Sequence, residues 1–175
     1  MRMKTALFAL VAALALVPIA RAADVSVTLT NVHLCCDKCV KGANKAVASV
    51  EGATCIADKT ARTVVITAAD ATTVQKATDA LIKAGFYGDS SDASVKITSE
   101  TGAKGEKVQT LKVNGVHLCC PKCVKAVKAA LAEVPGVTGD TVTNGETSFT
   151  VTGDFKDSDV FAALQKAGLT GTVGQ

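Results

Sequence analysis

The sequence predicts an α+β fold: two tandem ferredoxin-like βαββαβ domains that follow a signal peptide. Two observations carry this prediction. Residues 33–40 recur as residues 117–124, and the shift of 84 residues that aligns them also aligns the flanking apolar positions. Each copy then shows the order strand, helix, strand, strand, helix, strand, which is the split βαβ plan. We expect a signal peptide over 1–22, a first domain over 23–90, a linker over 91–106 and a second domain over 107–175.

The N-terminal residues have the pattern of a secretory signal. Arg2 and Lys4 precede an apolar stretch over residues 5–19, and Ala-Arg-Ala at 20–22 offers a small-x-small cleavage site. The apolar stretch of about 15 residues is short for the about 20 residues of a bilayer span, although an uncleaved anchor remains the alternative. The sequence therefore predicts an exported protein, periplasmic or extracellular, with no membrane span after cleavage.

The first strand and helix of each copy are predicted by a change of periodicity. Residues 25–29 alternate apolar and polar, as in a half-buried strand, and residues 111–113 repeat the pattern. A helix of about three turns follows, because apolar residues then recur at i, i+3, i+7 and i+10. These residues are Val40, Ala43, Val47 and Val50 in the first copy and Val124, Val127, Leu131 and Val134 in the second.

A hairpin and a second helix complete each copy. Residues 54–57 and 63–67 are typical of two strands, and the second copy places Asn144-Gly145 between strands at 141–143 and 147–151. The second helix shows apolar positions at Val74, Ala77 and Leu81, and at Val160, Leu164 and Ala167. Both helices end in Lys-Ala-Gly, at 83–85 and 166–168, before a short last strand near 86–87 and 169–173.

The repeated stretch holds almost all the soft-ligand chemistry of the chain. It contains six of the seven cysteines and both histidines, in the pattern His-Leu-Cys-Cys-x-Lys-Cys-Val. The strand-to-helix junction lets two cysteines spaced Cys-x-x-Cys converge, and the partial positive charge of a helix N-terminus favours thiolate over thiol. Thiolates select soft ions such as Cu(I) over magnesium or calcium. The candidate ligands are Cys36 with Cys39 and Cys120 with Cys123, and the further candidates are Cys35, Cys119, His33 and His117.

These residues resemble those of the heavy-metal-associated domain, the module of copper chaperones and of the periplasmic mercury-binding protein. The resemblance rests on the strand ending Leu-Lys-Val-Asn-Gly-Val-His at 111–117, on the Cys-x-x-Cys pairs and on the Lys-Ala-Gly-Phe sequence that ends at Phe86. It implies two domain copies in which Cys36/Cys39 and Cys120/Cys123 take the place of the family's metal pair. The loop here is longer than the family's by one or two residues and carries an extra cysteine.

The expected function is that of a heavy-metal scavenger, buffer or metallochaperone, with a metal-transporting or metal-accepting protein as partner. Cu(I) is the favoured ion and Hg(II) is an alternative. Because three cysteines and one histidine form a known zinc complement, Zn(II) is another. Whether the two modules act separately or hold one ion together is left open, as is the number of ions per chain.

Two other classes use cysteines in an oxidising compartment: a thiol–disulfide redox protein and a structural module stapled by disulfides. Seven cysteines cannot all pair within one chain, and Cys55 is predicted to be a small buried residue on a strand. No enzyme is expected, because no Ser/His/Asp set, paired carboxylate site or phosphate loop is present. Without residues 1–22 the chain has 16 basic and 16 acidic residues and no basic run, which excludes a nucleic-acid partner.

Overall fold

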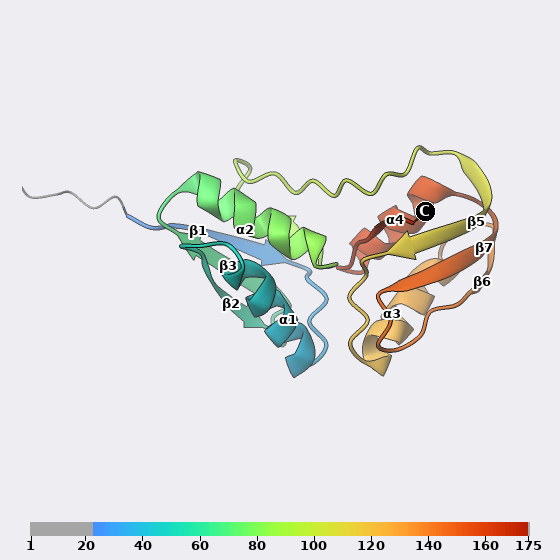
Figure 1. Ribbon diagram of the computed structural model, residues 1–175, viewed down its shortest axis with the longest axis horizontal. Helices are drawn as coiled ribbons and strands as arrows, with labels where there is room; N and C mark the ends of the chain where they lie inside the picture. The colour runs from blue at the N-terminus through green and yellow to red at the C-terminus, as the bar shows by residue number, and fades with distance from the viewer. Residues whose placement is uncertain (1–22, 175) are drawn as a thin grey trace, which may run out of the picture.

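The computed structural model describes residues 23–174, and the predicted signal peptide lies outside them. Two four-stranded antiparallel sheets, each with a pair of helices, follow one another along the chain (Figure 1). The first repeat consists of β1 (Val25–Thr30), α1 (Asp37–Ala48), β2 (Thr54–Asp58), β3 (Thr63–Ala68), α2 (Ala71–Lys83) and β4 (Asp89–Ser90). The second consists of β5 (Lys107–Asn114), α3 (Pro121–Ala132), β6 (Val137–Asp140), β7 (Ser148–Lys156), α4 (Asp157–Lys166) and β8 (Thr172–Val173).

Both sheets have the same strand order, β2-β3-β1-β4 and β6-β7-β5-β8. The two strands that flank the first helix of each repeat are therefore not neighbours: β3 lies between β1 and β2, and β7 lies between β5 and β6, as the split βαβ plan requires. This confirms the predicted fold class of two ferredoxin-like units. No helix among the described residues is long and apolar enough to cross a bilayer.

The cores are built from the periodic residues. Val27 and Leu29 of β1 are buried in the same core as Ala43 and Val47 of α1, as the period-two and helical patterns predict. In the second repeat Val127 and Leu131 of α3 occupy the matching positions. The core therefore fixes which face of α1 and of α3 is turned inward, and it thereby holds the N-terminus of each helix in place.

The structure differs from the prediction at two strands. The strand expected at 141–143 lies earlier in the chain, at β6. The partner strand β7 is nine residues long, so its pairing with β6 extends to Gly153, which lies opposite Val137. The register of this pairing shifts between Val137 and Gly139. Residues 141–143 instead lead into the turn at Asn144-Gly145. The expected last strand near Phe86 also lies later, at β4, because Phe86 pairs elsewhere.

Phe86 pairs with Leu169 of the other repeat in an isolated antiparallel bridge. Around it, the Tyr87 N–H donates to the Gly168 carbonyl and the Thr170 N–H donates to the Gly85 carbonyl, each at 3.1 Å. These bonds tie the end of α2 to the end of α4. The two repeats are thus joined by backbone hydrogen bonds and not only by the intervening chain.

Two glycines make this close approach feasible. Gly85 and Gly168 have φ of +88° and +81°, a conformation that side chains rarely adopt. A Cβ at Gly85 would lie under 3.0 Å from the backbone of Gly115 and His117, and one at Gly168 equally close to Asn31 and His33. Each Lys-Ala-Gly sequence therefore packs on the cysteine loop of the opposite repeat.

Candidate metal centre

The loop before each first helix sends alternate side chains in opposite directions. Val32 and Leu34 are buried in their own core, while His33 and Cys35, which alternate with them, are only half-buried. The Val32 N–H donates to the Arg62 carbonyl at 3.0 Å, and the His33 N–H donates to Gly168 of the other repeat at 3.1 Å. Since an extended chain alternates its side chains, anchoring Val32 and Leu34 inward turns His33 and Cys35 toward the other repeat.

The second repeat has the same construction. Val116 and Leu118 are buried, and the Val116 N–H donates to Thr147 while the Leu118 carbonyl accepts from Gly145 at 2.8 Å. His117 and Cys119 alternate with them. The one or two residues that lengthen this loop therefore add a further cysteine, Cys119, on the side that faces the other repeat.

The Cys-x-x-Cys pairs sit on the first turn of α1 and of α3. Cys36 and Cys120 are the N-cap residues, with extended φ of −162° and −158° and no capping bond from the side chain. Cys39 and Cys123, three residues later, are fully buried, and their N–H groups donate to the N-cap carbonyls at 3.0 Å. Both sulfurs of a pair therefore lie at a helix N-terminus, where the exposed N–H groups stabilise negative charge.

The two loops bring all six of these sulfurs into one cluster, in which every sulfur contacts at least one sulfur of the other repeat. Within a repeat, Cys36 and Cys39 are 3.8 Å apart and Cys120 and Cys123 are 3.7 Å apart. Across the repeats, Cys36 lies 3.8 Å from Cys120 and Cys39 lies 3.8 Å from Cys123. The remaining contacts, at 3.4–3.8 Å, involve Cys35 with Cys39, Cys120 and Cys123, and Cys119 with Cys36, Cys39 and Cys123.

All seven described cysteines are free thiols. The sulfur separations are well above the about 2.05 Å of a disulfide bond. Cys55, on β2, is outside the cluster and half-buried, with its thiol donating to Asn44 Oδ1 at 2.9 Å. It is therefore less buried than its predicted role as a small core residue requires.

The cysteines of the cluster influence one another's pKa through hydrogen bonds between their sulfurs. The hydrogen bond between Cys39 and Cys123 lowers the pKa of Cys39 and raises that of Cys123, so one thiolate is held by the other's S–H. Burial raises the pKa of Cys35 and of Cys119. Burial also acts to raise the pKa of Cys120, but hydrogen bonds from the Cys123 backbone N–H, the Cys35 thiol and the Lys122 backbone N–H together outweigh it and lower the pKa to about 7.

The two histidines flank the cluster in different surroundings. A ring nitrogen of His33 lies within 4.8 Å of the Cys35 and Cys123 sulfurs, and burial lowers the pKa of His33. The His117 ring stacks on Phe86 of the other repeat, with ring centroids 4.4 Å apart. The Nε2 atoms of both are buried without a hydrogen-bond partner among the described residues. Both are therefore free to donate to, or coordinate, a neighbour in the cluster.

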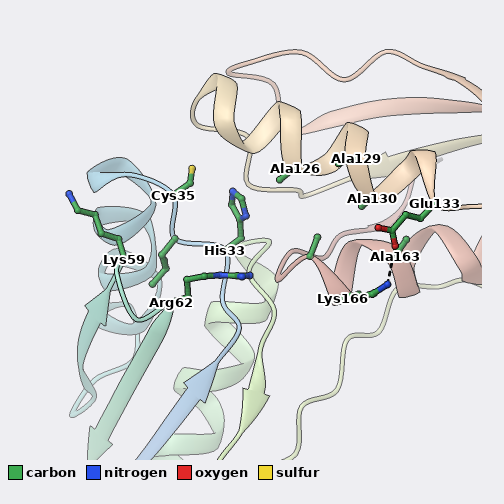
Figure 2. Close-up of a pocket in the computed structure, with 12 residues that line it drawn as sticks. His33, Cys35, Lys59, Arg62, Ala126, Ala129, Ala130, Glu133, Ala163 and Lys166 are labelled. Carbon is green, nitrogen blue, oxygen red and sulfur yellow. Dashed lines mark hydrogen bonds and ion pairs between the residues drawn. The ribbon is translucent and has the colours of Figure 1, made fainter.

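A cavity of about 550 Å³ reaches the cluster from one side. Figure 2 shows His33, Cys35 and Arg62 on one wall, facing Ala126 and Ala130 of α3 on the other. The rim carries Lys59 and Lys166, the latter paired with Glu133 at 3.0 Å. The small alanine side chains of α3 keep this cavity open, so Cys35 and His33 can be approached from outside.

The structure places all eight candidate ligands in the same region of the molecule. The six cysteines form the cluster, and the histidines lie at its edge. The sequence did not reveal the residues that hold the repeats together, namely Gly85, Phe86, Gly168 and Leu169. A signal for them was present, since the same Lys-Ala-Gly and a large apolar residue follow the second helix in both copies.

Comparison with known proteins locates this site in a family. The sequence model of the heavy-metal-associated domain matches residues 110–170. No curated protein matches the chain.

Three solved structures are similar to parts of the chain. The copper-binding domain from HMA7, a P-type ATPase, is 24% identical with a TM-score of 0.36, over 39% of this chain and 96% of that one. Oxidized MerP from Ralstonia metallidurans CH34 is 28% identical with a TM-score of 0.33, over 38% and 97%. The N-terminal soluble domains of Bacillus subtilis CopA are 16% identical with a TM-score of 0.32, over 87% and 95%. The family match covers the loop with Cys119, Cys120 and Cys123, and residues 110–170 therefore belong to the heavy-metal-associated domain family.

Proposed function

We propose that the protein is an exported binder of soft, thiophilic metal ions, with Cu(I) the favoured ion, and that it acts as a scavenger, buffer or metallochaperone. The observation that carries the proposal is the gathering of six free cysteine sulfurs into one cluster, in which ten sulfur pairs lie 3.4–3.8 Å apart. Thiolate is the ligand that Cu(I) prefers, and six in one place give a site with high affinity for soft ions.

The surroundings of the cluster support capture and release of an ion. The Cys-x-x-Cys sulfurs lie at two helix N-termini, whose partial positive charge offsets thiolate charge. The cavity beside Cys35 gives a route by which a thiol of a donor or acceptor protein can reach the cluster. A metal-transporting or metal-accepting protein is therefore the partner that we propose, with transfer by exchange of thiolate ligands.

A competition titration tests the proposal. The reduced full chain is titrated with Cu(I) under nitrogen in the presence of a chromogenic Cu(I) chelator. The wild-type protein is expected to withdraw Cu(I) from the chelator. The double variant Cys36→Ser/Cys120→Ser, which takes one sulfur from each helix N-cap, should bind at least about tenfold more weakly, because it loses direct ligands.

Cys55→Ser is the matched control, because it removes a thiol that is half-buried but lies outside the cluster. It should bind as tightly as the wild-type protein. Equal affinity and stoichiometry in the wild-type protein and in Cys36→Ser/Cys120→Ser would contradict the proposal.

A further inference from the structure

The sulfur contacts obey a twofold pattern that the repeat imposes. Exchanging each cysteine with its counterpart 84 residues away maps every one of the ten contacts onto another or onto itself. The contact of Cys36 with Cys119 at 3.7 Å, for example, corresponds to that of Cys120 with Cys35 at 3.4 Å. The cluster is thus built as two equivalent halves.

Each half is a triangle that takes sulfurs from both repeats. In the first triangle, Cys36 and Cys39 are 3.8 Å apart, and Cys119 lies 3.7 Å and 3.4 Å from them. In the second, Cys120 and Cys123 are 3.7 Å apart, and Cys35 lies 3.4 Å and 3.5 Å from them. Together the two triangles use each of the six sulfurs once.

We propose that the protein holds two soft metal ions, each bound by three thiolates: the Cys-x-x-Cys pair of one repeat and the extra cysteine of the other. Cys119 completes the site of Cys36 and Cys39, and Cys35 completes the site of Cys120 and Cys123. The inference rests on the proposed function and adds the coordination of the ion and the crossing of one ligand between repeats.

The size of the triangles fits three-coordinate binding. Edges of 3.4–3.8 Å place the centre of a triangle about 2.1 Å from each sulfur, close to the about 2.3 Å of a metal–thiolate bond such as Zn–S. A linear two-thiolate site needs its two sulfurs about 4.6 Å apart, twice that bond length. The Cys-x-x-Cys sulfurs are closer together than this, so a third ligand suits them better than a linear ion.

The competing arrangement keeps all three ligands in one repeat. Cys119, Cys120 and Cys123 do lie within 4.8 Å of one another. Adjacent residues in an extended loop direct their side chains apart, however, whereas Cys35 enters from the opposite repeat with both contacts at 3.5 Å or less. The interlocked ends of α2 and α4 hold the two loops at this distance.

Variants that lack the Cys-x-x-Cys pair of one repeat distinguish a third ligand from the other repeat from a third ligand within the same repeat. The background Cys36→Ser/Cys39→Ser leaves Cys120 and Cys123 with both candidate third ligands, Cys35 and Cys119. Loaded with one equivalent of Cu(I), the full chain in this background should show three sulfur neighbours by X-ray absorption.

Adding Cys35→Ser to this background should reduce the count to two sulfurs and weaken Cu(I) binding by at least about tenfold. Adding Cys119→Ser, the matched control, should change neither. The reversed result, or no effect of either substitution, would overturn the inference and leave the proposed function standing. A wild-type protein that binds no Cu(I) would overturn both.

The mirror set guards against a variant that fails to fold. In the background Cys120→Ser/Cys123→Ser, the roles exchange: Cys119→Ser should weaken binding and Cys35→Ser should not. Far-ultraviolet circular dichroism of each metal-free variant reports whether the fold is kept. Agreement of the two sets supports ligands that cross between repeats, and a set in which each pair depends on its own repeat's extra cysteine contradicts them.

Discussion

Replacing Gly85 with alanine should separate the two repeats and divide the cysteine cluster. Gly85 has φ of +88°, and an added Cβ would overlap the backbone of Gly115 and His117 in the other repeat. The left-handed conformation costs a non-glycine residue about 1–2 kcal/mol. The overlap adds about 1–3 kcal/mol, because backbone atoms on both sides cannot move away as a side-chain end can.

Gly52→Ala provides the matched control within the same repeat. Gly52 has φ of +79°, and its added Cβ would have no atom within 4 Å. It should therefore lower the free energy of unfolding by the conformational term alone, about 1–2 kcal/mol. Gly85→Ala should lower it by about 2–5 kcal/mol, or should leave each repeat folded while breaking the contact between them.

Urea unfolding gives the free-energy change, and nuclear Overhauser effects between the Phe86 and His117 rings report the contact between repeats. We expect Gly85→Ala to lose those effects and Gly52→Ala to keep them. If both variants show the same unfolding free energy and the same ring contacts, the interlock by Gly85 is refuted.

Two further predictions concern the contact between the repeats and the start of α4. Phe86→Leu, which copies Leu169 of the other repeat, should lower the free energy of unfolding by about 1–2 kcal/mol. Because it removes the ring that stacks on His117 at 4.4 Å, it should shift the ring-proton resonances of His117 but not those of His33. Equal shifts of both histidines would contradict this stacking. Asp157→Asn should cost about 1–2 kcal/mol at neutral pH, while Asp159→Asn at an exposed position should be neutral. Burial opposes ionisation of Asp157, but the Lys104 and Ser158 N–H groups lower its pKa, so this stability is present above the ordinary value of 3.8 and is lost as pH falls below it. A pH-unfolding series in which Asp157→Asn and the wild-type protein lose stability in parallel would contradict that role.

The fold was largely predictable because each copy repeats a strong pattern. The alternation in β1 and the i, i+3, i+7 spacing in α1 both follow directly from burial of one face. The β6 strand was misplaced because Thr141 to Thr143 have the composition of a strand, whereas the pairing is decided by the length of β7. Single-segment patterns do not contain that information.

The ligands were also predictable, but their arrangement was not. The Cys-x-x-Cys pairs and the extra cysteines can be read from the two copies of residues 33–40. That Cys35 faces Cys120 depends on backbone contacts made by Gly85 and Gly168, which are far from the cysteines in sequence. A sequence repeat predicts that two units have the same fold, but it does not predict how the two units pack against each other.

The central claim is that two three-thiolate sites share one cluster across the two repeats. The most direct test is X-ray absorption of the wild-type chain loaded with two equivalents of Cu(I). The sulfur triangles predict three sulfurs at about 2.3 Å from each copper. Because the triangles are in contact through Cys36 with Cys120 and Cys39 with Cys123 at 3.8 Å, a second copper should also lie within that distance. Two sulfurs per copper with no neighbouring copper would instead mean that each repeat binds its ion alone, and would contradict the claim.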